Sequence, residues 1–318
     1  MRPLTDTVPK PLLPFMDRPF LHHVLDHLGR YGVEEAICSS PYLESAFRSF
    51  LGERTNAPRV TWIAEEVPLG TGGAIAGARG LLPETFLVLN GDVLTDLDLG
   101  ALVARHRERG AVATIASIRV PDARPYGLVE TGPQDRVRAF REKPQEPIPG
   151  TVNAGTYVLE PEVLDDVAGL APVSIERDTF PALIRSGRSV FSFRWDGYWR
   201  DLGTPRAYLE AHADALMGRI GPAGPRPLIG AGASVDPRAT IGELVVVGAG
   251  SSVGPGAKIE GSVLHPGTRV DPDASVVGSI LGEGVRVGAG ASVISSILGR
   301  GAEVPPGASL EAVRLPAG

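Results

Sequence analysis

The chain has 318 residues, with 31 Lys and Arg against 37 Asp and Glu, so its formal net charge is −6. This balance argues against a nucleic-acid-binding protein, whose binding surface is basic. The length favours about two domains, and the shares of hydrophobic (43%) and charged (21%) residues exclude a globally disordered chain.

The cysteine and hydropathy patterns indicate a cellular compartment. A single cysteine, Cys38, excludes an internal disulfide and a cysteine-based zinc site, which fits a reducing environment. We interpret Cys38 as a buried strand residue. No apolar run approaches the roughly 18 residues of a membrane-spanning helix, and Met1–Thr5 lacks an apolar signal segment. We therefore predict a cytoplasmic protein without a membrane partner.

Residues 1–217 alternate short apolar, β-branched runs with amphipathic stretches. This alternation predicts an α/β domain with a mostly parallel sheet, which binds ligands at the carboxyl ends of its strands. The expected strands are 36–38, 60–63, 86–89, 113–118 and 190–193. The expected helices are 20–28, whose apolar residues share one face, and 99–110, which Gly110 ends.

The first polar segment surrounds Lys10, which lies between Pro9 and Pro11. We expect the prolines to hold Lys10 extended before the first helix. An ammonium group fixed there could bind phosphate oxygens as a point charge. The alternative is a solvated loop lysine.

The second segment, 65–75, is a glycine-rich turn that follows the strand 60–63 and opens a helix. Glycines let a flat ligand approach the backbone, and a helix N-terminus offers free N–H groups. The spacing matches neither a dinucleotide fingerprint nor a Walker loop. The alternative is a plain strand-to-helix connection.

In the third segment, a buried strand ends in Asn90-Gly91-Asp92. A carboxylate at the end of a buried strand is a typical ligand of Mg²⁺, which takes one or two carboxylates together with phosphate oxygens. The alternative is a turn or capping role. We assign that role to Asp96 and Asp98, which precede the helix that starts at Leu99.

Four further stretches place a polar group beside a small residue, as a binding site for a polyol requires. Each alone is more often structural. The stretches are 126–129, 140–144, 152–157 and 198–204.

A second domain follows residues 218–228, which have the Pro and Gly density of a linker. Beyond it, aliphatic residues recur every six positions from Ile229 to Ile259, and then in a 17-residue unit at 261–277, 278–294 and 295–311. One inward aliphatic side chain per six residues predicts triangular coils of short strands, and stacked coils bury a continuous apolar column. We expect this β-helix over 229–311 and a tail at 312–318.

Several motifs occur together and in order in residues 1–217: PLTxxxPKP, PLGTGG, LNGD, YGLV, EKP, VNAGTY and YWRDLGTP. In this combination the chain resembles the sugar-1-phosphate nucleotidylyltransferases, most closely the mannose-1-phosphate guanylyltransferases. The resemblance implies a Rossmann-like nucleotidyltransferase domain with a mixed sheet. The repeats resemble the left-handed parallel β-helix of hexapeptide-repeat proteins, and their handedness is implied by that resemblance.

The resemblance also implies the reaction: an NTP and a hexose 1-phosphate give an NDP-sugar and pyrophosphate, with Mg²⁺ as cofactor. GTP and mannose 1-phosphate are the favoured pair, ahead of glucose 1-phosphate with a uracil or thymine nucleotide. Asp92 and Asp201 would be the catalytic metal ligands, and Lys10 the clamp on the phosphates. We also expect a homo-oligomer, because β-helix flanks and ends favour self-association.

The implied substrate-binding residues divide by ligand part. Lys143 would hold the sugar phosphate. Glu142 and Asn153 would bind the sugar hydroxyls, and Glu176 is a further implied substrate-binding residue. The remaining residues are Gly127 and Gly155 against the sugar ring, Gly70 and Thr71 against the base, and Asn90 of the LNGD motif.

The family pattern opens with a strand and a Gly-Gly-x-Gly-Thr-Arg loop, immediately before the equivalent of Met1–Thr5. The printed sequence starts after both. We hypothesise that Met1 is an internal methionine of the reading frame, so that the domain 1–217 is N-terminally incomplete and lacks its first strand. We expect activity to require the loop, which would cradle the triphosphate.

Two other functions remain open at this stage. A hexapeptide-repeat acyltransferase needs a histidine base and a protruding loop. Only His265 lies in the repeats, where we expect it to be solvated at a coil corner, and no large insertion is visible. A non-catalytic regulatory homologue would bind a sugar nucleotide. The missing loop favours this reading, whereas Lys10, Asp92 and Asp201 argue against it.

Overall fold

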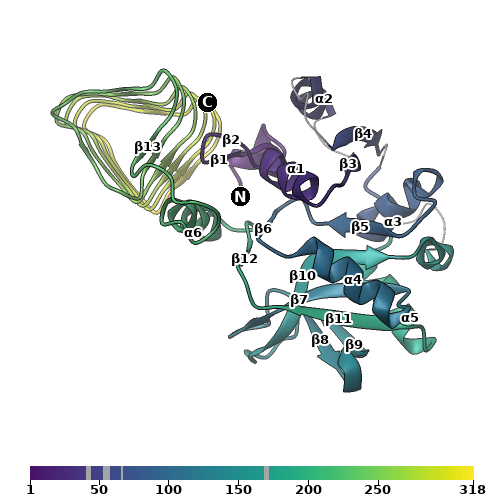
Figure 1. The fold of residues 1–318 in the computed structure, drawn as a ribbon. Helices are drawn as coiled ribbons and strands as arrows, with labels where there is room; N and C mark the ends of the chain where they lie inside the picture. Colours follow the sequence, from purple (N-terminus) through teal and green to yellow (C-terminus); the bar gives the residue numbers. More distant parts are fainter. Residues whose placement is uncertain (41–43, 53–57, 66, 168–171) are drawn as a thin grey trace. The chain divides into compact units, whose positions relative to one another are not determined.

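The computed structural model describes residues 1–318 except 41–43, 53–57, 66 and 168–171. Glu66 of the glycine-rich segment therefore lies outside the described residues. The chain forms two compact units, one of residues 25–199 and one that joins residues 1–24 to residues 200–318 (Figure 1). Each unit has its own apolar core. In the described part of the chain, no helix has the length and apolarity to cross a membrane.

The unit of residues 25–199 contains the α/β elements. Its α-helices are α1 (Phe20–Arg30, which begins in the other unit), α2 (Glu44–Gly52), α3 (Gly70–Gly77), α4 (Leu99–Arg109) and α5 (Phe180–Arg185). Its short helices are Arg79–Leu81, Pro133–Asp135, Pro161–Asp166 and the π-helical turn Ile175–Thr179. Its strands are β3 (Glu35–Ser40), β4 (Arg59–Ala64), β5 (Phe86–Leu89), β6 (Val93–Thr95), β7 (Ala113–Val120), β8 (Gly127–Thr131), β9 (Val137–Glu142), β10 (Gly150–Leu159) and β11 (Val190–Trp195), and β12 (Trp199–Asp201) crosses into the other unit.

The main sheet of this unit is mixed, as expected. It has the order β11-β7-β10-β8-β9, with β5 also paired to β10. Only β11 and β7 run parallel in it, and a separate parallel pair joins β3 to β4. The expectation of a mostly parallel sheet is therefore wrong for the main sheet. Strand β10 pairs antiparallel with β5, β7 and β8, and β8 and β9 form a hairpin whose short turn joins antiparallel strands. All five expected strands are confirmed.

Helix α4 begins and ends as the sequence predicts. The Asp98 carboxylate accepts a hydrogen bond from the Ala101 amide at 2.8 Å, and Gly110 adopts a left-handed conformation after the last turn. Asp96 does not cap this helix. Its carboxylate accepts hydrogen bonds from the Trp195 indole (2.7 Å) and the Tyr198 amide (2.8 Å), so it fixes the segment before β12.

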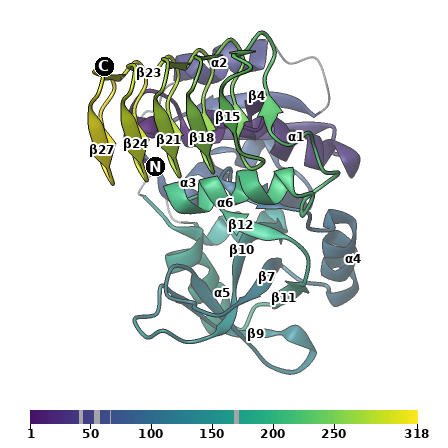
Figure 2. The same cartoon turned by 90° about the vertical axis from the view of Figure 1, so that its left-hand side faces the viewer.

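The other unit is dominated by a parallel β-helix, whose stacked coils are seen in Figure 2. Its N-terminal residues form the short helices Leu4–Asp6 and Lys10–Leu12 and the hairpin of β1 (Pro14–Phe15) and β2 (Arg18–Pro19). Helix α6 (Pro205–Leu216) precedes the coils. The coil strands are β13 (Leu228–Ile229), β14 (Ser234–Val235), β15 (Thr240–Ile241), β16 (Val246–Val247), β17 (Ser252–Val253), β18 (Lys258–Glu260), β19 (Val263–Leu264), β20 (Arg269–Val270), β21 (Ser275–Val277), β22 (Ile280–Leu281), β23 (Arg286–Val287), β24 (Ser292–Ile294), β25 (Ile297–Leu298), β26 (Glu303–Val304), β27 (Ser309–Glu311) and β28 (Arg314–Leu315).

The hexad anchors form the predicted interior column. Residues one coil apart pair in register, so that Leu264 lies between Val247 and Leu281. Ile229 differs, because it belongs to the strand that opens the column and is 41% exposed. The segment 312–318 also differs from the expected tail, since β28 pairs with β25 and extends the β-helix. Cys38 lies on β3 as expected but is half-buried rather than buried.

One face of the β-helix is apolar on its outside as well. Four outward-facing residues of the sheet β13-β16-β19-β22-β25-β28 are buried: Val246, Val263, Ile280 and Ile297. They form one cluster with Leu4 and Leu13 of the N-terminal residues and with Tyr208 and Leu216 of α6. On the neighbouring faces the corresponding positions carry exposed polar residues such as Ser252 and Arg269. The N-terminal residues and α6 therefore cover this face.

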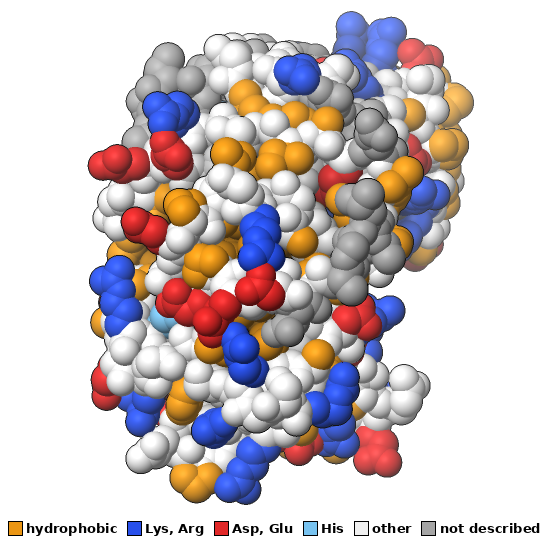
Figure 3. All heavy atoms as spheres, turned by 90° about the vertical axis from the view of Figure 1, so that its right-hand side faces the viewer, with side chains coloured by type: hydrophobic (Ala, Val, Ile, Leu, Met, Phe, Trp, Pro, Cys, Tyr) orange, Lys and Arg blue, Asp and Glu red, His pale blue; other side chains and the backbone are white. Residues whose placement is uncertain are grey.

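Charged side chains of both signs are mixed on the molecular surface. On the face drawn in Figure 3, Lys and Arg side chains are interspersed with Asp and Glu. Exposed ion pairs of the described residues include Arg188 with Glu162 and Arg124 with Asp122. Exposed pairs of this kind contribute little to stability.

A ladder of buried serines joins successive coils. Ser262, Ser279 and Ser296 occupy equivalent positions 17 residues apart. The Ser262 hydroxyl accepts a hydrogen bond from the Ser279 amide, and the Ser279 hydroxyl accepts one from the Ser296 amide, each at 3.0 Å. The repeat length therefore produces side-chain bonds between coils as well as the strand ladders.

Replacing Ser279 by alanine is expected to lower the free energy of unfolding by about 1–3 kcal/mol, because the buried Ser296 amide loses its acceptor. Urea denaturation would measure the loss. The control Ser275→Ala removes a half-buried, outward-facing hydroxyl from the preceding repeat and is expected to cost at most about 0.5 kcal/mol. Equal losses in the two variants would contradict a role for the ladder.

Candidate active site

The glycine-rich turn is held close to the backbone of residues 173–175. Gly70 has φ +72°, and a Cβ atom there would lie 2.6 Å from the Val173 carbonyl oxygen. The same oxygen accepts a hydrogen bond from the Gly72 amide at 2.8 Å. A larger residue than glycine would therefore separate the two segments. The predicted helix start is confirmed, since α3 begins at Gly70.

Glu65 supports this turn, a role that the sequence analysis missed. One carboxylate oxygen accepts from the Leu69 amide at 3.0 Å, and the other accepts from the Ser39 hydroxyl on β3 at 2.8 Å. The available signal was an acidic residue shortly before a helix N-terminus, where carboxylates bind free amides.

Glu176 collects three hydroxyl donors. Its Oε2 atom accepts from Thr71 at 2.8 Å and from Ser174 at 2.9 Å. Its Oε1 atom accepts from the Tyr157 hydroxyl at 3.2 Å. Glu176 lies in the π-helical turn Ile175–Thr179, an uncommon conformation that often marks functional sites. The structure thus joins Thr71 and Glu176, which are 105 residues apart in the sequence.

The next group of predicted residues lies at and beside a bulge in β10. The register of β10 against β7 shifts between Asn153 and Tyr157. Asn153 donates from Nδ2 to the Tyr157 hydroxyl at 2.7 Å and accepts from the Gly155 amide at 2.9 Å. The Gly155 carbonyl accepts from the Asn90 amide at 2.8 Å, and a Cβ atom on Gly155 would lie 2.8 Å from Asn90 Nδ2. Asn90, Asn153 and Gly155 therefore lie together.

Glu142 adds a second carboxylate to this group. It pairs with Gly127 across the β8–β9 hairpin, and a Cβ atom on Gly127 would lie 2.9 Å from its Oε2 atom. Burial and then the nearby Glu176 charge raise the pKa of Glu142, while Lys143 and Arg177 oppose the rise. Lys143 is exposed, and its amide donates to the Tyr126 carbonyl at 3.0 Å.

Trp199 fixes the outer side of β10. Its indole donates to the Ala154 carbonyl at 2.8 Å, and the Tyr126 ring contacts it edge-on with centroids 5.1 Å apart. The predicted residues of this unit that the structure connects are Gly70, Thr71, Asn90, Gly127, Glu142, Asn153, Gly155 and Glu176.

In the other unit, the side chains of Lys10 and Asp201 both lie close to Gly203. The Gly203 amide donates to the Asp201 carboxylate. A Cβ atom on Gly203 would lie 2.6 Å from that carboxylate and 3.7 Å from Lys10 Nζ. Lys10 is not extended as predicted. It begins a short 3₁₀ helix, because a proline is tolerated in a first helical turn and Pro11 occupies the second position. Asp92 belongs to the unit of residues 25–199, and a role shared with Asp201 is part of the proposal below.

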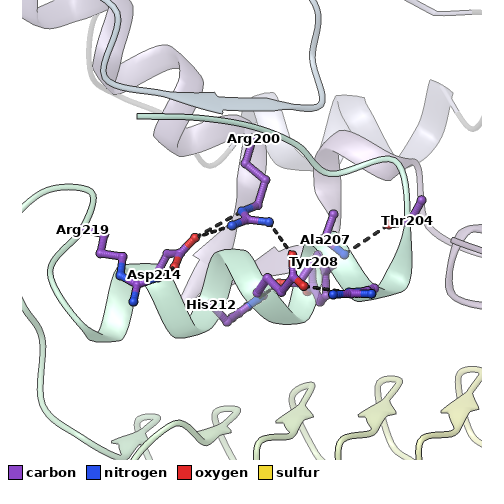
Figure 4. A network of polar contacts seen from close by, with 9 residues as sticks. Arg200, Thr204, Ala207, Tyr208, His212, Asp214 and Arg219 are labelled. Atoms are coloured by element: carbon purple, nitrogen blue, oxygen red, sulfur yellow. Dashed lines mark hydrogen bonds and ion pairs between the residues drawn. The ribbon is translucent and has the colours of Figure 1, made fainter. Parts of the chain in front are cut away.

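Buried side chains of α6 bond to the N-terminal hairpin. Figure 4 shows two of them, Tyr208 and His212. The Tyr208 hydroxyl donates to the Pro14 carbonyl and lies 3.0 Å from His265 Nε2. His212 accepts from the Met16 amide at 3.2 Å and donates from Nδ1 to the Tyr208 carbonyl at 2.8 Å. The expectation that His265 is solvated is wrong: it is 3% exposed because Tyr208 of α6 packs on that coil. The acyltransferase alternative therefore loses its accessible base.

These histidines give folding stability a pH dependence. Burial lowers the pKa of His212 to about 4 and that of His265 to about 3. Below pH 6.5 the unfolded chain binds protons that the folded chain does not, so stability falls as the pH falls. We expect a loss of about 2 kcal/mol per histidine between pH 7 and pH 5. His212→Gln keeps an acceptor near the Met16 amide. In this variant the free energy of unfolding from urea denaturation should depend less steeply on pH, by the slope that corresponds to one proton. Parallel curves for the two proteins would contradict this role of His212.

Comparisons with known proteins agree with this architecture. Residues 1–218 match the family model described as nucleotidyl transferase, and residues 224–315 match the model described as GMPPB C-terminal domain. A mannose-1-phosphate guanylyltransferase of Mycobacterium tuberculosis is 38% identical over 276 residues, which cover 84% of this chain and 77% of that protein. A mannose-1-phosphate guanyltransferase beta-B of Xenopus laevis is 34% identical, over 76% of this chain and 70% of the relative.

A solved structure shows the same fold. HddC from Yersinia pseudotuberculosis, complexed with GMP-PN, has a TM-score of 0.57 and 27% identity, and the match covers 66% of this chain and 92% of that one. Together with the mixed α/β unit and its polar site, these matches define a nucleotide-transferring class of protein. The chain belongs to the nucleotidyl transferase family.

Proposed function

We propose that the chain transfers a guanylyl group from GTP to mannose 1-phosphate, which gives GDP-mannose and pyrophosphate. The observation that carries the proposal is the cluster of Thr71, Glu176, Tyr157 and Asn153, in which separate family motifs meet in one set of hydrogen bonds. The choice of guanine and mannose is supported by the names of relatives that are 34–38% identical to the chain.

The reaction needs orientation and charge neutralisation rather than a covalent enzyme intermediate. A phosphate oxygen of the sugar phosphate attacks the α-phosphorus of GTP in line with the bond to the β-phosphate. That bond breaks, and pyrophosphate leaves with its electron pair. Lys10 would neutralise the nucleotide phosphates and Lys143 the sugar phosphate.

The polar cluster would bind the neutral parts of the two substrates. Glu142 and Glu176 offer carboxylate acceptors to sugar hydroxyls, and Asn153 offers a second N–H donor. The backbone at Gly127 and Gly155 would contact the sugar ring, and the Cβ positions of these glycines face Phe140 and Asn90. Gly70 and Thr71, at the start of α3, would lie against the base.

A divalent cation would be held by carboxylates of this chain together with the substrate phosphates. Among the residues that the structure describes, no group of three or more His, Cys, Asp and Glu could hold a metal. Mg²⁺ suits such a protein, because it takes one or two carboxylates and completes its coordination with phosphate oxygens and water. We assign Asp92 and Asp201 as its ligands. When bound, the ion would neutralise charge on the triphosphate.

The test is pyrophosphate release with Mg²⁺ across a panel of NTPs and hexose 1-phosphates. Both the printed chain and a form that includes any residues encoded upstream of Met1 should be assayed. GTP with mannose 1-phosphate is expected to give the highest kcat/KM. A preference for glucose 1-phosphate with UTP or dTTP would replace the proposed substrates. Binding of a sugar nucleotide without pyrophosphate release from either form would favour the regulatory homologue.

A further inference from the structure

We infer that Tyr157 is a positioning residue that couples the nucleotide end of the site to its sugar end. The inference rests on the proposed function and deepens it. The observation behind it is one chain of hydrogen bonds that runs from Thr71 through Glu176 and Tyr157 to Asn153.

Every bond in this chain has one permitted direction. The Asn153 Oδ1 atom accepts from the Gly155 amide, so its Nδ2 atom is the donor to the Tyr157 hydroxyl. That hydroxyl has one proton and must give it to Glu176, because a carboxylate offers only acceptors. The Thr71 hydroxyl likewise donates to Glu176 and accepts from the Ile175 amide at 2.9 Å.

Burial makes the central link hard to replace. Tyr157 is 0% exposed and packs edge-on against Phe180, with ring centroids 5.0 Å apart. Burial and then the Glu176 charge raise the pKa of Tyr157 well above its usual value, so the phenol keeps its proton. Solvent cannot reach the hydroxyl to substitute for it. Loss of that hydroxyl leaves the Asn153 amide without its acceptor and Glu176 with one donor fewer.

Both ends of the chain are fixed to backbone that would contact a substrate. Thr71 lies in the first turn of α3 and is bonded to the backbone at Ile175. Asn153 is bonded to Gly155, whose carbonyl holds the Asn90 amide after β5. A ligand that moves Thr71 or Glu176 therefore changes the orientation of Asn153, and the reverse is also true. Such coupling is reciprocal in binding free energy.

The experiment measures this coupling without turnover. Calorimetry gives the Kd of mannose 1-phosphate alone and with saturating Mg²⁺ and a GTP analogue whose α–β bridge is a methylene group. In the wild-type protein the two values should differ about fivefold or more. In Tyr157→Phe the ratio should fall to about one. Thr71→Val, at an exposed position that puts folding at little risk, should lower the ratio in the same way.

Thr114→Val is the matched control. It removes another buried hydroxyl of the same unit, which is hydrogen-bonded to His106 at 2.9 Å, and it should destabilise the fold while the ratio stays as in wild type. The inference would be overturned if the ratio of the two Kd values stayed at the wild-type value in Tyr157→Phe, or if it fell to one in Thr114→Val. A ratio of one in the wild-type protein would overturn it as well. A wild-type protein that binds neither ligand would instead refute the proposed function, and the inference with it.

Discussion

Asp201→Asn is expected to lower kcat/KM for pyrophosphate release about a thousandfold, the scale of losing one preorganised charge-stabilising group. The substitution keeps an oxygen that can accept from the Gly203 amide, so the turn before α6 should be retained. It removes the negative charge of Asp201, which lies near Lys10. We assign that charge to cation binding. Steady-state kinetics at several Mg²⁺ concentrations should also show that more cation is needed for half-maximal activity.

Asp196→Asn provides the control for this loss. Asp196 is exposed and pairs with Arg194 at 3.3 Å. The substitution Asp196→Asn therefore makes the same chemical change outside the proposed site. Its kinetic constants and thermal midpoint should stay near those of wild type. If Asp201→Asn keeps most of its activity, Asp201 is not part of the catalytic machinery. If both variants lose activity equally, the effect is a general one of net charge.

The periodic parts of the fold were predictable from the sequence because they depend on local patterns. A hexad of aliphatic residues places one side chain inward per strand, and every strand it marks is present. Asp98 and Gly110 bound α4 through contacts within a few residues of it. The direction of the sheet strands was not predictable in this way. It depends on which strands pair, and β10 pairs with β5, β7 and β8 from distant parts of the chain.

The candidate site shows the same division. The family resemblance pointed to Thr71, Asn153 and Glu176, but no spacing in the sequence shows that a buried hydroxyl at Tyr157 joins them. Likewise, the environment of His265 could not be read from its repeat. The repeat places this residue at a coil corner, and burial comes from Tyr208, which is 57 residues away in the sequence. Tertiary neighbours, rather than local pattern, set the chemistry of both residues.

Ile280→Asp is expected to destabilise the β-helix unit by about 4 kcal/mol or more, because it places a charge in a closed apolar cluster. Ile280 is 0% exposed, although it points outward from its coil. It shares its cluster with Leu13, which follows Lys10 closely, and with Tyr208 of the helix that follows Asp201. We therefore expect the urea midpoint to fall. We also expect kcat/KM to fall, even when it is assayed at a temperature at which the variant is still folded.

The comparison variant is Ser252→Asp, which places the same charge at an exposed outward position of another face of the β-helix. It should change stability by at most about 0.5 kcal/mol and leave activity intact. Urea midpoints and pyrophosphate release, measured on both variants, separate the two faces. If Ile280→Asp were as mild as Ser252→Asp, the N-terminal residues and α6 would not cover that face in solution. A large loss confined to Ile280→Asp would show that the β-helix supports the segments that carry Lys10 and Asp201.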